Sequence, residues 1–236
     1  TSSLVGSEMC IRDRTVGVYQ LETGKTIWLK TGTPKEKFLT NISWSPDEQH
    51  IYIAELNREQ NEMNLVCYSA VTGQKEGVLF TEKDEHYVEP QHPLLFLPNQ
   101  PDQFIWQSER DGYNHLYLYN TNGELLKQLT KGDWVVMDVL GFDEKGENLF
   151  ISSTQPSPIS SFGPDHGPLS VKTWSLNLKK GKSTCLAKDA VLTGVHNTQL
   201  SGSGKYLLDN YSSWDIPRKI VLVDTKTVSY THLTLP

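Results

Sequence analysis

The stretch ISWSPDEQHIYIAELNREQNEMNLVCYSAVTGQ, residues 42–74, contains the unit that recurs along this chain. It consists of an apolar run, a Pro-Asp turn, a second apolar run, and a third run that ends in a glycine-containing turn. His50 and Tyr52 alternate with Ile51 and Ile53, which is the period-two pattern of a β-strand. The stretch therefore predicts strands that are joined by tight turns.

Both halves of this unit are repeated. The first half recurs at residues 94–109, 140–154 and 198–213, where apolar runs again flank a turn. The second half recurs at spacings of 49, 50 and 58 residues, in turns that contain Gly24, Gly73, Gly123 and Gly181. Glycine supplies the positive φ that such hairpin turns require. Repeats of about 50 residues with four strands each are typical of β-propeller blades, in which repetition protects the sheet edges.

The predicted fold is all-β, a partial β-propeller with about three full four-stranded blades and two incomplete ones. No stretch combines helical periodicity with helix length, and a β-sandwich with accidental periodicity is the alternative fold. Large rings are expected to pack blade against blade. The rings in question are Trp44, Trp106, Phe142, Phe150, Trp174 and Tyr206. The expected segments are a truncated blade at 15–41, blades at 42–90, 91–137 and 138–190, a hairpin insertion at 154–170 within the last of these, and an incomplete blade at 191–227.

The two ends of the chain are related through DNA. MCIRD, residues 9–13, can be encoded by a segment whose reverse complement encodes VSYTH, residues 228–232. A transposase inserts the same short end sequence, inverted, on both sides of a genomic fragment. We therefore expect residues 1–14 and 228–236 to be adapter-derived and not native. The remaining part, about 213 residues, is long enough for one large domain or part of one.

The composition excludes several classes of protein. The formal net charge is −6, and no run of Lys or Arg supplies the positive patch that nucleic-acid binding needs. The longest apolar runs have only a few residues, so we expect no transmembrane segment. Outside the expected adapters, Cys67 and Cys185 are too far apart in sequence to form a metal-binding spacing.

The residues themselves supply no catalytic set. A nucleophilic serine normally lies within G-x-S-x-G, and the nearest matches, around Ser183 and Ser203, lack a required glycine and fit hairpin turns. The histidines show no metal-binding spacing, and no glycine-rich phosphate loop precedes a helix. We therefore predict no catalytic residue, no metal site and no cofactor. Asn41-Ile-Ser43 matches the glycosylation pattern, which is common by chance.

Two long stretches go beyond a generic propeller. They are HYVEPQHPLLFLPNQPDQFIWQSERDGYNHLYLYNTNGELLKQLTKGDWVV, residues 86–136, and GVHNTQLSGSGKYLLDNYSSWDIPRKIVLVD, residues 194–224. They resemble the N-terminal propeller of the dipeptidyl peptidase IV family, in particular its bacterial branch, within the prolyl oligopeptidase superfamily. The most specific part is SERDGYNHLYLY with QLTKGDWVV, and the similarity covers essentially all of residues 15–227.

The resemblance implies a two-domain serine-type peptidase that removes dipeptides from N-termini, typically after proline. Its propeller caps an α/β-hydrolase domain that carries the Ser-Asp-His triad. We expect that domain downstream of Thr227, and the paired glutamates that bind the substrate's amino group upstream of Thr15. The chain alone should then be inactive, and it should aggregate or partly unfold because an unclosed propeller exposes blade faces.

The resemblance also implies partners and a location. The partners are peptides with a free N-terminus, the C-terminal hydrolase domain, and a second copy of the protein in a homodimer. The implied location is the bacterial periplasm or cell surface.

One stretch is implied to lie at the edge of the substrate cavity. The family has an aromatic-Arg step before a Pro-x-x-Pro turn, and alignment on Pro90 and Pro93 places Val88 and Glu89 at this step, next to Tyr87. A carboxylate cannot donate the charged hydrogen bond that a guanidinium donates. The location is therefore carried over without the role: Tyr87, Val88 and Glu89 are expected at the cavity edge.

Two other functions remain open. The first is a non-catalytic propeller that binds or scaffolds other proteins, as many propellers do. The second is a peptidase with acylaminoacyl or oligopeptidase specificity. The residues upstream of this chain would distinguish this second alternative from a dipeptidyl peptidase, because paired glutamates indicate capture of a free amine.

Overall fold

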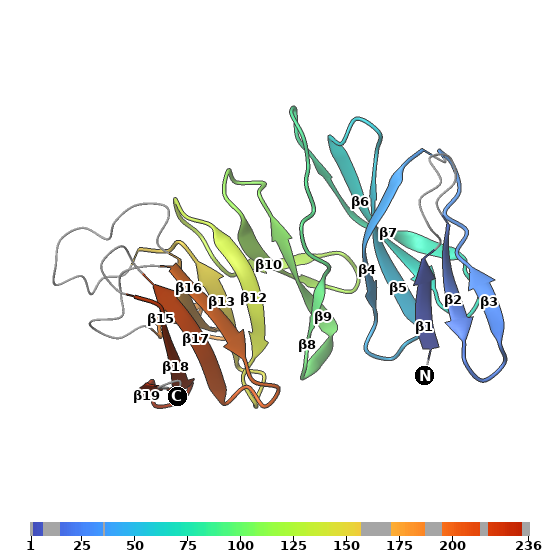
Figure 1. The fold of residues 1–236 in the computed structure, drawn as a ribbon. Helices are drawn as coiled ribbons and strands as arrows, with labels where there is room; N and C mark the ends of the chain where they lie inside the picture. Colours follow the sequence, from blue (N-terminus) through green and yellow to red (C-terminus); the bar gives the residue numbers. More distant parts are fainter. Residues whose placement is uncertain are drawn as a thin grey trace. The chain divides into compact units, whose positions relative to one another are not determined.

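The computed structural model describes residues 2–6, 15–34, 36–156, 171–186, 195–212 and 217–232. The expected adapter residues 7–14 and 233–236 lie outside these ranges, as does most of the predicted hairpin insertion, residues 157–170. Within the described ranges all regular structure is β, with nineteen strands in five antiparallel sheets (Figure 1). No helix in this part of the chain could span a membrane. The all-β prediction is confirmed.

The chain folds into two compact units. The first contains residues 1–111 and 116–128, and the second contains residues 112–115 and 129–236.

The first unit contains three sheets, and in each the spatial order of the strands follows their order along the chain. The three-stranded sheet consists of β1 (Ser2–Gly6), β2 (Val16–Gln20) and β3 (Lys25–Trp28). The second sheet consists of β4 (Phe38–Trp44), β5 (His50–Leu56), β6 (Glu62–Ser69) and β7 (Lys75–Lys83). The third consists of β8 (Leu95–Leu97), β9 (Gln100–Ser108), β10 (His115–Asn120) and β11 (Leu125–Gln128).

The second unit contains two four-stranded sheets with the same order. One consists of β12 (Val136–Phe142), β13 (Asn148–Ser153), β14 (Lys172–Asn177) and β15 (Lys182–Cys185). The other consists of β16 (Val195–Leu200), β17 (Tyr206–Ser212), β18 (Lys219–Asp224) and β19 (Tyr230–His232).

These sheets have the form expected of propeller blades. Three four-stranded sheets, β4–β7, β8–β11 and β12–β15, correspond to the three full blades, which confirms the fold class. The segment boundaries stay a prediction. So does the adapter origin of the two ends, although β1 and β19 fall within those stretches.

Strand β5 shows how the sequence alternation becomes packing. Ile51 and Ile53 are fully buried in the core between the first two sheets of this unit. Tyr52 and Ala54, on the opposite face, belong to the core that β4–β7 shares with β8–β11. Because side chains alternate between the faces of a strand, one run of residues supplies two interfaces.

Aromatic rings fill the second of these interfaces. The Phe104 and Tyr119 rings stack with centroids 5.8 Å apart, and Phe80 stacks on Tyr119 at 4.4 Å.

Trp106, Phe150 and Trp174 are buried, as the sequence predicts. The prediction for Tyr206 is wrong, because it is 44% exposed on the face of β17 that also carries the exposed Leu208.

Two of the repeated glycines have a role beyond the turn. Gly73 and Gly123 adopt φ values of 70° and 87°. A Cβ atom on Gly73 would lie 2.3 Å from the carbonyl oxygen of Trp28, and one on Gly123 would lie 2.2 Å from that of Leu79. In the sheets β4–β7 and β8–β11, the turn after the third strand therefore packs against the outermost strand of the preceding sheet, where only glycine leaves enough room.

Candidate functional site

Tyr87, Val88 and Glu89 lie in the connection between β7 and β8, residues 84–94. Tyr87 is 60% exposed and Glu89 is also exposed, whereas Val88 is partly buried against the aromatic core. The connection therefore presents an aromatic ring and a carboxylate to solvent and is fastened by the apolar side chain between them.

The β5–β6 turn holds one side of this connection. The backbone N–H of Val88 donates to the carbonyl oxygen of Gln60 at 2.7 Å, and that of Asp84 donates to Asn61 at 3.1 Å. The turn is itself fixed, because the Asn57 side-chain oxygen accepts the Asn61 N–H at 3.0 Å. In an antiparallel sheet the turn after the second strand and the exit from the fourth lie at the same end, which places these segments side by side.

Side chains of β4 hold the other side, where the Ser43 hydroxyl donates to the carbonyl oxygen of Leu94 at 3.5 Å. The amide nitrogen Nδ2 of Asn41 donates to the carbonyl oxygens of Pro90 and His92, both at 2.9 Å. Asn41 lies in β4 at an irregularity between Thr40 and Ser43, with φ of 53°. Both hydrogens of the amide are used within the protein, so Asn41 is an anchor and not a free glycosylation acceptor. The sequence pattern around it gave no indication of this role.

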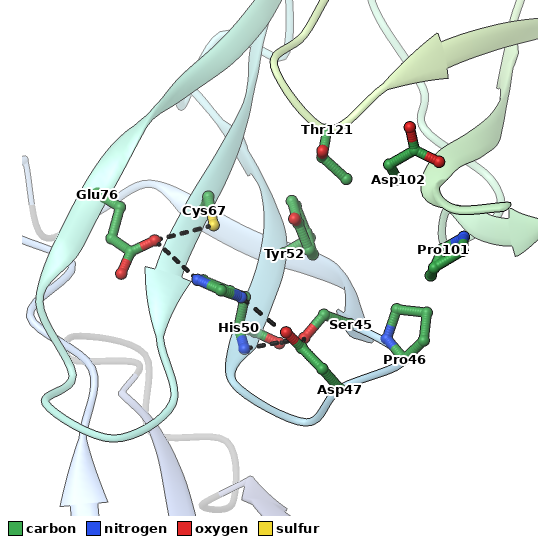
Figure 2. A pocket seen from close by; sticks show the side chains of 10 residues that line it. All are labelled: Ser45, Pro46, Asp47, His50, Tyr52, Cys67, Glu76, Pro101, Asp102 and Thr121. Atoms are coloured by element: carbon green, nitrogen blue, oxygen red, sulfur yellow. Dashed lines mark hydrogen bonds and ion pairs between the residues drawn. The ribbon is translucent and has the colours of Figure 1, made fainter.

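A cavity of about 450 Å³ lies at the opposite end of the β4–β7 sheet, next to the turns of β8–β11. Figure 2 shows His50 between the carboxylates of Asp47 and Glu76, with the Cys67 thiol beside Glu76 and the carboxylate of Asp102 across the cavity. Sequence reasoning missed this group, because its members come from one turn, from three successive strands of one sheet and from a strand of the next sheet, and no fixed spacing connects them.

The contacts in this cavity are those of a hydrogen-bonded cluster. His50 Nε2 lies 3.3 Å from Glu76 Oε2, and its Nδ1 lies 3.8 Å from Asp47 Oδ1. The Cys67 thiol donates to Glu76 Oε2 at 3.6 Å. Burial and the adjacent Glu76 charge raise the pKa of Cys67 to about 12, so the thiol is protonated at neutral pH. A protonated thiol is not a nucleophile, and the cavity therefore offers acceptors without an activated nucleophile.

The serines nearest to an elbow motif have no catalytic partners among the described residues. Ser203 lies in the β16–β17 turn, where its hydroxyl contacts that of Ser201 at 3.2 Å. Ser183 lies in β15 rather than in the preceding turn, and its hydroxyl accepts from the Gln155 amide at 3.1 Å. These contacts are structural.

The second unit contains a buried His-Asp pair. His196 Nδ1 lies 2.7 Å from Asp209 Oδ2, and the Thr198 hydroxyl donates to Asp209 Oδ1 at 3.2 Å. His196 Nε2 is buried and has no hydrogen-bond partner among the described residues. A triad would require a serine hydroxyl at this nitrogen, so the pair does not form one in the described part of the chain.

Comparison with known proteins gives a consistent result. Residues 13–218 match the family model of the dipeptidyl peptidase IV (DPP IV) N-terminal region. The chain is 39% identical to a protein from Bacteroides ovatus described as a dipeptidyl aminopeptidase IV. The match to its crystal structure has a TM-score of 0.82 and covers 94% of this chain and 32% of that one.

More distant relatives match as well. Porphyromonas gingivalis dipeptidyl peptidase 4 is 20% identical with a TM-score of 0.79, and the match covers 94% of this chain and 29% of that one. A protein of Emericella nidulans assigned as dipeptidyl peptidase 4 is 23% identical over 90% of this chain and 27% of its own length. The chain thus spans about a third or less of the length of these relatives.

Proposed function

The chain belongs to the family of proteins that carry a dipeptidyl peptidase IV N-terminal region, and from this premise we propose that it is propeller sequence of a serine-type dipeptidyl peptidase. In this role the blades gate and orient peptides for a separate α/β-hydrolase domain. They exclude folded proteins by size and hold short N-termini near the nucleophile. The observation that carries the proposal is the family match over residues 13–218.

The proposal assigns no catalytic residue to this chain. The reaction would use a triad in the hydrolase domain, and the substrates would be peptides with a free N-terminus. The identity of 39% to the Bacteroides ovatus protein supports a bacterial enzyme of this class. A homodimer and a periplasmic or surface location belong to the same proposal.

We also propose that Tyr87, Val88 and Glu89 border the substrate cavity. The exposure of Tyr87 and Glu89 on an anchored connection supports this, because a ligand can reach both side chains without displacing the backbone. No ion pair engages the Glu89 carboxylate within the described residues.

The function is tested on a full-length protein that carries this segment. Its hydrolysis of an Ala-Pro chromogenic substrate is compared with that of the same substrate acetylated at the N-terminus. A dipeptidyl peptidase cleaves only the free amine, an oligopeptidase that cleaves after proline also cleaves the blocked substrate, and a non-catalytic propeller cleaves neither. Either of the last two results would overturn the proposed function.

The cavity edge is tested by Glu89→Ala, with Glu22→Ala as the matched control because Glu22 is an exposed residue in the β2–β3 turn. We expect Glu89→Ala to change catalytic efficiency or substrate preference, and Glu22→Ala to change neither. If Glu89→Ala also changes neither catalytic efficiency nor substrate preference, the assignment of residues 87–89 to the cavity edge is wrong. The proposed peptidase function is then unaffected.

A further inference from the structure

The connection that carries Tyr87 and Glu89 depends on a residue almost fifty positions earlier in the chain. We infer that Asn41 is a positioning residue that fixes the 87–89 stretch relative to the β4–β7 sheet. The consequence for substrate binding rests on the proposed function, whereas the positioning itself does not.

The chemistry of the connection explains why an asparagine is needed. The carbonyl oxygens of Pro90 and His92 both point to one nitrogen, Asn41 Nδ2, at 2.9 Å. Pro90 and Pro93 have no backbone N–H, so this part of the connection is poor in donors of its own. A primary amide offers two N–H donors on one uncharged nitrogen, and the short asparagine side chain can hold two carbonyls close to its own strand.

The backbone of β4 directs the side chain to this position. The φ of 53° at Asn41 lies in the left-handed region, which asparagine adopts far more readily than other residues with a Cβ atom. The register of β4 against β5 shifts between Thr40 and Ser43 at this point. Such an irregularity re-aims a side chain out of the regular alternation of the strand. Asparagine at position 41 therefore meets two requirements: it adopts the positive φ of the backbone, and it supplies the two N–H donors.

The anchors act on both sides of the exposed residues. Gln60 and Asn61 hold the segment up to Val88, and Asn41 holds it from Pro90 onward. Loss of the Asn41 amide therefore frees one side only. The position of Glu89 then becomes variable although the sheet keeps its fold, whereas Tyr87 stays between the anchored residues Asp84 and Val88.

Two substitutions separate the amide from the backbone. Asn41→Gly keeps access to positive φ and removes the amide. Asn41→Asp keeps the shape and places a carboxylate opposite two carbonyl oxygens. Asn122→Gly is the matched control, because Asn122 is an exposed turn residue at the β10–β11 turn.

The first measurement is hydrogen exchange of a full-length protein that carries this segment, followed by mass spectrometry. We expect exchange within residues 89–94 to become about ten-fold faster in both Asn41 variants, with unchanged protection of the Asp84 and Val88 N–H groups and of β5 and β6, and no change in Asn122→Gly. If this segment exchanges in Asn41→Gly at the same rate as in the wild-type protein, the inference is overturned.

The second measurement uses a full-length peptidase that carries this segment. We expect Asn41→Gly to raise KM about five-fold and to leave kcat within about two-fold, because the substitution affects binding of the substrate and not the chemical step. An unchanged KM together with faster exchange would overturn the role in substrate binding. An inactive wild-type protein would instead overturn the proposed function, and the exchange result would be unaffected.

Discussion

The Glu82 carboxylate on β7 accepts a hydrogen bond from the indole Nε1 of Trp106 on β9 at 3.0 Å, which ties the outermost strand of one sheet to the next sheet. The other oxygen of Glu82 accepts from the Ser108 hydroxyl at 3.0 Å. Arg110 completes the group by pairing with Glu82 and lying over the Tyr117 ring, 4.3 Å from its centroid. Polar groups in a mostly apolar interface are tolerated because each has a partner.

Removal of the Glu82 carboxylate should destabilise the first unit. The side chains of Glu82 and Arg110 are 13% and 30% exposed, so Glu82→Ala leaves a guanidinium without its counter-ion in a partly buried place. We expect a loss of about 2 kcal/mol in the free energy of unfolding, reduced from the value for a fully buried pair by solvent screening. Urea unfolding of the dilute chain, followed by tryptophan fluorescence, measures this.

The control for this prediction is Glu62→Ala on the same sheet. Glu62 pairs with Lys83 at 2.9 Å, and the two side chains are 37% and 65% exposed, more than those of Glu82 and Arg110. We expect little change, since exposed ion pairs contribute little to stability. An equal effect of the two substitutions would contradict the importance assigned to Glu82.

The repeated glycine at position 123 should be more sensitive than a glycine that is needed only for its backbone conformation. Gly112 has a φ of 94°, and a Cβ atom there would meet nothing within 4 Å. We expect Gly112→Ala to cost about 1–2 kcal/mol of unfolding free energy from the backbone alone. Gly123→Ala should cost clearly more, because its Cβ would also collide with the Leu79 carbonyl oxygen. If urea unfolding gives equal losses of free energy for the two variants, the β10–β11 turn can move away from β7 without an energetic cost.

The sequence predicts those features of the fold that depend on residues close together in the chain. The alternation in β5 and the glycine in each turn follow from local geometry, and both are found as expected. The close approach of Gly123 to Leu79 could not be predicted, because it depends on the distance between two sheets. Tyr206 was misassigned for the same reason: the alternation shows that a face exists, but not whether another sheet covers it.

The site was predictable only in part. The position of Tyr87 to Glu89 came from a family resemblance, and the structure adds the anchors of this stretch. Asn41 is separated from Pro90 by nearly fifty residues, so no local pattern connects them. The pairing of His50 with Glu76 is likewise a cross-strand relationship that the sequence does not display.

The Cys67 thiol should resist alkylation in the folded chain. Only the thiolate reacts, and burial together with the Glu76 charge raises the pKa of Cys67 from 9.0 to about 12. In a Cys10→Ser, Cys185→Ser background we expect iodoacetamide at pH 8 to react at least about ten-fold more slowly with folded than with urea-unfolded chain. The rate in the folded chain should keep rising with pH beyond the point at which the unfolded chain levels off.

Glu76→Gln tests the electrostatic part of this effect. Removal of the carboxylate charge lowers the pKa of Cys67, so alkylation at pH 8 should become faster in the folded chain. Glu62→Gln, on the same sheet, should leave the rate unchanged. If Glu76→Gln has no effect on the rate, burial alone protects the thiol.

One face of the β16–β19 sheet should drive self-association of the chain. Leu207, Tyr211, Val221 and Val223 are buried on one side of this sheet. On the other side, Leu208 and Leu222 are direct cross-strand partners, and both are exposed next to Tyr206. A contiguous apolar surface of this kind favours contact with another apolar surface over contact with water.

A pair of substitutions on this face should therefore reduce association. Leu208→Lys with Leu222→Glu replaces the apolar pair by opposite charges that attract each other across the strands. The sedimentation coefficient of a self-associating chain increases with protein concentration. We expect this increase to be much smaller in the double variant. The control is Leu125→Lys with Leu126→Glu, because these exposed residues are adjacent in edge strand β11 and point to opposite faces. If the control reduces association equally, net surface polarity and not the β16–β19 face governs it. If neither variant does, the contact lies elsewhere on the chain.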